Sequence, residues 1–134
     1  EREAVEFFVN NAHDNLIDEL KANHQKYIKI SEKAKSPQKM REIIQQEEYD
    51  IHEKIINFMG NDLIARIYRL NADRIKLFRL DYDFSYTTEH VIDALTEHGE
   101  IIDSMSHRNL NKTLEKMDHH SSMALKRALG PPYL

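Results

Sequence analysis

The chain contains no cysteine and no tryptophan, and only three glycines and three prolines among its 134 residues. The absence of cysteine excludes disulfide bonds, thiolate nucleophiles and zinc sites built on cysteine. Any metal ion must therefore be held by histidine, aspartate or glutamate. Long apolar runs are also missing: the longest are pairs and triplets such as residues 7–9. A membrane-spanning helix needs about 20 apolar residues in succession, so we expect no contact with a membrane.

A basic excess is absent as well. The formal net charge is −4 and the isoelectric point is near 6.1. Domains that grip nucleic acids usually carry an excess of lysine and arginine on one face, so this segment is not expected to bind DNA itself. The length fits one domain, and no linker-like stretch divides it, so we predict a single domain over residues 1–134.

The amino-acid composition and the residues typical of helix ends predict an all-α fold. Valine occurs only three times, whereas leucine, isoleucine, lysine and glutamate fill the periodic segments. Ser36 followed by Pro37 is a strong helix start, Asp14 is a possible N-cap, and Gly60 can end a helix in the left-handed conformation. We predict an antiparallel bundle of about six helices, over residues 2–12, 14–35, 36–59, 62–79, 86–106 and 110–129, with the longest break at 81–85 and a firm stop at 130–132.

Two polar residues fall within the apolar row of the third predicted helix. That row consists of Ile44, Ile51, Ile55 and Met59. Glu48 and His52 lie in the same row, one turn apart, so a carboxylate and an imidazole point inward together and can chelate one metal ion. The alternative is an inward ion pair or a hydrogen-bonded core pair, because buried polar groups usually satisfy one another.

Histidines also interrupt the apolar rows of the last two predicted helices. His98 lies in the middle of one row and His120 in the other, whereas the neighbouring His119 faces outward. A lone inward histidine is usually a satisfied core residue. Burying three histidines and a carboxylate without water or a hydrogen-bonding partner would cost free energy of folding. A metal ion that all four bind is the simplest common partner. Such nitrogen and oxygen donors suit Zn²⁺, Ni²⁺, Mn²⁺ or Fe²⁺.

Arg74 continues the apolar row of the fourth predicted helix. The other members of that row are Leu63, Ile67, Leu70 and Leu77. We therefore expect this guanidinium to point towards the interior, where it could bind a carboxylate in bidentate fashion. The alternatives are an internal salt bridge or a side chain that reaches the surface.

The joint spacing of these motifs resembles a known family. Glu48 precedes His52 by four residues, a Gly-Asn pair ends nine residues after that histidine, and Glu97-His98 is followed 22 residues later by His120. This pattern is similar to the C-terminal effector-binding domain, or FCD domain, of FadR-like GntR-family transcription regulators. The family usually has aspartate where this chain has Glu48.

The resemblance implies a function. It implies that Glu48 and the three histidines hold one divalent transition metal at the base of an internal cavity, and that a small carboxylate effector binds there, assisted by Arg74. It further implies a cytoplasmic homodimer that is not an enzyme and that reaches DNA only through an N-terminal winged-helix domain missing from this chain. The alternatives are a mononuclear metalloenzyme, because three histidines and a carboxylate also occur in such enzymes, and a metal-free helical interaction module.

Overall fold

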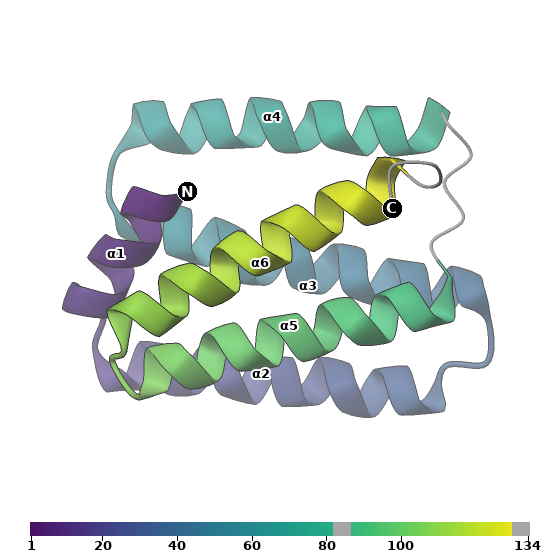
Figure 1. Cartoon of the computed structure of the whole chain (residues 1–134), viewed down its shortest axis with the longest axis horizontal. Helices are drawn as coiled ribbons and strands as arrows, with labels where there is room; N and C mark the ends of the chain where they lie inside the picture. Colours follow the sequence, from purple (N-terminus) through teal and green to yellow (C-terminus); the bar gives the residue numbers. More distant parts are fainter. Residues whose placement is uncertain (82–86, 130–134) are drawn as a thin grey trace.

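The protein is a bundle of six α-helices in the part of the chain that the structure describes (Figure 1). This computed structural model describes residues 1–81 and 87–129, and the side chains of all of these except 78–81. The helices are α1 (Arg2–Asn11), α2 (Asp14–Lys33), α3 (Pro37–Phe58), α4 (Asp62–Asp81), α5 (Thr88–Ser106) and α6 (Leu110–Leu129). The all-α prediction is confirmed, and the predicted helix ends agree within two residues. Most of the predicted break at 81–85 and the stop at 130–132 lie outside the described residues.

Local capping groups set several of these helix ends. The Ser36 hydroxyl accepts a hydrogen bond from the Lys39 amide at 3.1 Å, with Pro37 at the first helical position. Gly60 has φ +67°, the left-handed conformation that ends a helix. The expected N-cap at Asp14 is wrong. His13 occupies the N-cap position without a side-chain hydrogen bond, and Asp14 lies in the first turn, where its charge complements the helix dipole.

Two apolar clusters fill the bundle, and a polar layer separates them. The larger cluster includes Phe8, Ile55 and Ile101, and the smaller one includes Ile44 and Leu95. Along both α3 and α5, the smaller cluster comes first and the larger one follows about two turns later. Between them, the buried side chain on each of these helices is polar: Glu47 on α3 and His98 on α5. The candidate site residues His52, His98 and His120 therefore lie within helices of the bundle rather than at a loop.

Helix α4 packs on α3 with a different face from the one that we expected. Its inward face carries the buried Ala65, with Ile64 and Tyr68 against the larger cluster. The predicted row is exposed instead: Leu63, Ile67, Leu70 and Leu77 are each at least half exposed, and Arg74 is exposed with them. The prediction that this row and Arg74 point inward is therefore wrong.

The physical reason is that α4 carries two apolar rows, and the helical period alone does not decide which one is buried. Small Ala65 lets the backbone of α4 approach α3 closely, and Tyr68 lies about 200° around the helix from Leu70.

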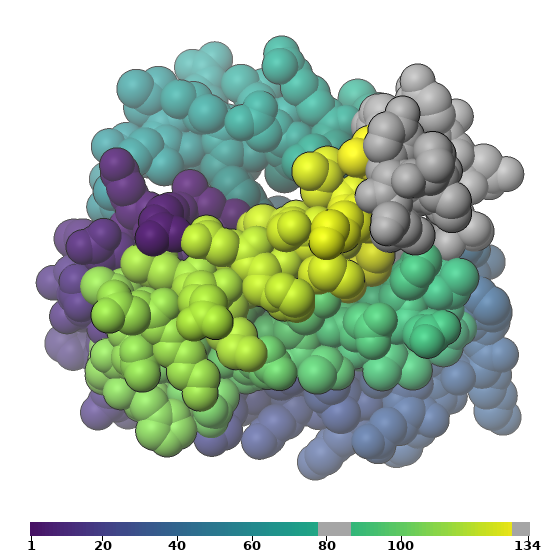
Figure 2. Space-filling view, in the orientation of Figure 1, coloured from purple at the N-terminus to yellow at the C-terminus, as the bar shows by residue number. Residues whose placement is uncertain are grey.

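The space-filling view shows a hollow between α4 and the C-terminal half of α6 (Figure 2). None of the described helices has the length and apolar character that crossing a bilayer requires.

Candidate metal centre

Three histidines from three helices meet in the polar layer. One ring nitrogen from each of His52 on α3, His98 on α5 and His120 on α6 lies within 4.8 Å of those of the other two. All three side chains are buried, and His98 is completely inaccessible to solvent. We refer to these residues as the histidine cluster. The sequence placed each of them on an inward row, and the fold brings these rows together.

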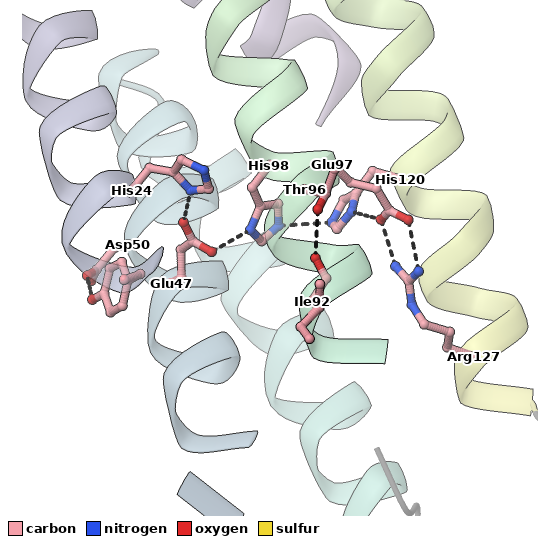
Figure 3. Close-up of polar contacts among 10 residues, drawn as sticks. His24, Glu47, Asp50, Ile92, Thr96, Glu97, His98, His120 and Arg127 are labelled. Atoms are coloured by element: carbon pink, nitrogen blue, oxygen red, sulfur yellow. Dashed lines mark hydrogen bonds and ion pairs between the residues drawn. The ribbon is translucent and has the colours of Figure 1, made fainter. Parts of the chain in front are cut away.

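His98 and His120 face each other through their Nε2 atoms, which are 3.2 Å apart. On the other side of each ring, Nδ1 contacts a carboxylate: Glu47 Oε2 lies 3.0 Å from His98, and Glu97 Oε2 lies 2.7 Å from His120 (Figure 3). A carboxylate only accepts hydrogen bonds, so each Nδ1 donates. In a neutral ring the proton is then absent from Nε2. Two lone pairs therefore point at one another.

This arrangement fits a divalent ion. Two facing lone pairs repel unless a proton or a cation lies between them. Two imidazole nitrogens that each lie about 2.0–2.1 Å from a tetrahedral zinc ion are separated by roughly 3.3–3.4 Å. The observed separation of 3.2 Å agrees with that value. Carboxylates on the distal nitrogens are also the partners that metal-binding histidines commonly have.

His52 completes the cluster from α3. Its ring stacks against that of His120, with 5.5 Å between centroids and 25° between planes, and its Nδ1 donates to Glu1. Burial alone would lower the pKa of His52, but the charges of Glu1, Glu48 and Glu47 outweigh burial and raise it. The surroundings of this ring are therefore strongly negative, which favours a cation.

Glu47 is a completely buried acid that binds two imidazoles. Its second oxygen accepts from Nδ1 of His24 on α2, so a chain of polar contacts runs from α2 through Glu47 to the cluster (Figure 3). Burial acts to raise the pKa of Glu47, but hydrogen bonds from His24 and His98 reverse the effect and lower it. Burial, followed by the neighbouring His120, lowers the pKa of His98. A lowered pKa favours the neutral ring, which is the form that binds metal.

Glu97 anchors the other side of the cluster. Its two oxygens accept from both terminal nitrogens of Arg127, at 2.8 and 2.7 Å, in addition to the ring of His120. Burial opposes ionisation, but these hydrogen bonds lower the pKa of Glu97 to about 2. Arg127 is only 5% exposed, so this bidentate ion pair is shielded from water.

The predicted fourth ligand, Glu48, does not belong to the cluster as the structure places it. It is half-buried on α3, one turn before His52, and its charge acts on that ring. The three histidines approach one another without it. Ligation by Glu48 therefore stays a prediction.

The sequence analysis missed Glu47, Glu97 and Arg127. Helical spacing could have found them: Glu47 comes three residues after Ile44, Glu97 three after Ala94, and Arg127 seven after His120. Each therefore shares an inward row. A long charged side chain at such a position usually reaches the surface, so only the tertiary contacts show that these three are buried or nearly so.

Two grooves on the surface of α3 do not reach the histidine cluster. One lies between α3 and α4, and its lining residues are Glu42, Gln45, Gln46, Tyr49 and Lys76. The other is lined by residues of α2 and α3, among them Asn23 and Asp50. The internal cavity expected beside the metal ligands therefore stays a prediction.

Comparison with known proteins adds a family to this geometry. Residues 1–122 match the model of the FCD domain. The chain belongs to the FCD-domain family. FCD domains are the regulatory, effector-binding domains of GntR-type regulators, so the sequence resemblance is confirmed at that level. The matched part of this FCD domain contains the whole histidine cluster and ends before Arg127. Neither the curated proteins nor the solved structures that were compared with the chain gave a match.

Proposed function

We propose that this FCD domain senses a small organic acid through a divalent metal ion, as the regulatory half of a FadR-type bacterial transcription regulator in the cytoplasm. The histidine cluster would hold the ion, with Glu48 as a fourth ligand. The observation that carries the proposal is the pair of Nε2 atoms 3.2 Å apart, with the Nδ1 atom of each ring against a carboxylate. A bound ion such as Zn²⁺, Ni²⁺, Mn²⁺ or Fe²⁺ would supply positive charge and open coordination positions for the carboxylate.

The proposed function is regulation rather than catalysis. The residues of the cluster come from α3, α5 and α6, so a ligand that binds there contacts three helices at once. An effector can shift the positions of these helices only as far as it binds one arrangement more tightly than the other. Such a shift would be passed to a DNA-binding domain outside this chain.

A homodimer is part of the same proposal, and the exposed row of α4 is the surface that we assign to it. Leu63, Ile67, Leu70 and Leu77 recur at steps of four, three and seven, with Arg74 at the intervening position. This is the spacing of a helix that packs lengthwise against another helix. The row lies on the side of α4 opposite α3, where a second copy can reach it.

The proposal is tested by thermal shift with a panel of small carboxylates. Mono- and dicarboxylates should raise the melting temperature of the metal-loaded domain, and amines and neutral sugars should not, because the ion offers its open positions to an anion. His98→Ala should abolish both metal content and the response to acids. If no acid in a broad panel acts on the metal-loaded protein, or if the shift survives metal removal, the metal-anchored sensor is excluded.

Arg74→Ala tests the remaining prediction for that residue. The effector role of Arg74 no longer has the support of an inward position, since the side chain is exposed. A weaker response to acids at unchanged metal content would establish the role. An unchanged response would remove Arg74 from the effector site.

A further inference from the structure

The two nitrogens of each ring in the facing imidazole pair have different partners: Nε2 faces the other ring, and Nδ1 contacts a glutamate. Glu47 and Glu97 come from α3 and α5 and approach the pair from opposite sides (Figure 3). Glu47 is completely buried, and the Glu97 side chain is 11% exposed. Both are held by a further basic group, His24 for Glu47 and Arg127 for Glu97.

We propose that Glu47 and Glu97 are positioning residues that hold His98 and His120 in the tautomer with the proton on Nδ1, so that both Nε2 lone pairs point at the metal. The inference rests on the proposed metal site and adds two residues to it. The evidence is geometric: the oxygens of Glu47 and Glu97 lie 3.0 and 2.7 Å from the Nδ1 atoms, and carboxylates cannot donate a hydrogen bond to them.

The external partners fix the two carboxylates. Arg127 donates two hydrogen bonds to Glu97, one to each carboxylate oxygen. This bidentate ion pair sets the plane of the carboxylate as well as its position. Arg127 lies on α6, beyond the part of the chain that matches the family model. On the other side, both Glu47 oxygens are already committed to imidazole nitrogens, one to His24 and one to His98.

Replacing either glutamate by glutamine removes this control. Glutamine has one accepting oxygen and one donating NH₂ group, so Glu47→Gln cannot accept from both of its imidazole partners. If the NH₂ group faces His98, that ring must accept at Nδ1 and carry its proton on Nε2, where it blocks the metal. If the NH₂ group faces His24, the contact that holds the other oxygen of residue 47 in place is lost. In Glu97→Gln the NH₂ group faces a donating nitrogen of Arg127 in either orientation, because both carboxylate oxygens accept from Arg127. The bidentate pair that fixes the group against His120 is then lost.

A matched control lies on α3 itself. Glu53 is 8% exposed, and its Oε1 accepts from Nε of Arg69 at 2.6 Å. Its described hydrogen bonds, to Arg69 and Asn57, do not involve the histidine cluster. Glu53→Gln therefore removes a largely buried, paired carboxylate without changing the tautomer of a proposed ligand.

The experiment measures the zinc dissociation constant of each variant by competition with a chromophoric chelator, and the melting temperature of each metal-free form. We expect Glu47→Gln and Glu97→Gln to weaken zinc binding by about 10–100-fold, the range typical of such outer partners. Glu53→Gln should lower the melting temperature and leave zinc affinity unchanged. Equal zinc affinity in all four proteins, or equal weakening in all three variants, would overturn the positioning role. If the wild type binds none of Zn²⁺, Ni²⁺, Mn²⁺ and Fe²⁺, the proposed function itself fails.

Nitrogen-15 NMR of the zinc-loaded wild type provides a test that needs no variant. His98 and His120 should each show a protonated Nδ1 and a metal-bound Nε2. Coordination through Nδ1 in either ring would overturn the inference, even if the glutamine variants do not fold.

Discussion

His119 and His120 are neighbours on α6 with opposite surroundings. His120 is 3% exposed and contacts His98 and Glu97, whereas His119 is exposed. One step along a helix turns the side chain by about 100°, which is enough to move it from the interior to solvent. We predict that His120→Ala loses bound metal and that His119→Ala retains it, as measured by elemental analysis of the purified proteins. Equal loss in both variants would contradict the assigned orientation of α6.

Gly99 lets His24 reach Glu47. A Cβ atom at position 99 would lie 2.9 Å from Nε2 of His24, closer than real contacts allow. Alanine normally stabilises a helix interior by about 1 kcal/mol relative to glycine, but here it must displace a ring that Glu47 holds. We predict that Gly99→Ala is more favourable in a His24→Ala background than in the wild type, with a coupling free energy of about 1 kcal/mol. Urea unfolding of the four proteins measures this coupling, and strict additivity would contradict it.

At the scale of the element, α4 differs from the other helices because its longer apolar row is exposed. We predict that Leu70→Glu keeps the monomer folded, because this leucine is 54% exposed, and shifts the protein from dimer towards monomer. Leu125 on α6 is 60% exposed and serves as the control, since Leu125→Glu adds the same charge away from α4. Sedimentation equilibrium measures the association constant. Dimers of equal stability in both variants would place the interface elsewhere.

Helix α3 shows how one element serves the core and the site together. Its buried positions Ile44, Glu47, Ile51 and Ile55 follow one another at helical steps, so the carboxylate occupies a place in the apolar row. The Glu53–Arg69 pair then joins the same helix to α4. Buried apolar residues before and after Glu47 on α3 pack in the core, and Glu47 lies between His24 and His98.

For the whole molecule, the proposed ion would join α3, α5 and α6 at the layer where the apolar core is interrupted. An ion that binds only the folded state stabilises it by linkage, by about 2.7 kcal/mol when its free concentration is 100 times the dissociation constant. We predict that chelation lowers the melting temperature of the wild type and that addition of Zn²⁺, Ni²⁺ or Mn²⁺ restores it. His98→Ala, which lacks a central ligand, should not respond to chelator. A wild type that melts identically with and without chelator would contradict a bound ion.

The sequence by itself determined the helices and most of the inward rows. Capping groups such as Ser36 and Gly60 act within one turn of chain, and the helical period places His52, His98 and His120 on apolar rows, so local information is sufficient for these features.

Only the tertiary structure decided which rows meet. Helix α4 carries two apolar rows, and the choice between them depends on how closely Ala65 lets it approach α3, which no local pattern encodes. Glu47, Glu97 and Arg127 were assigned to the site only by their contacts, because each is paired with a residue that lies 23 or more positions away on another helix. A buried charge is stable only beside its partner, and the partner is chosen by packing in three dimensions.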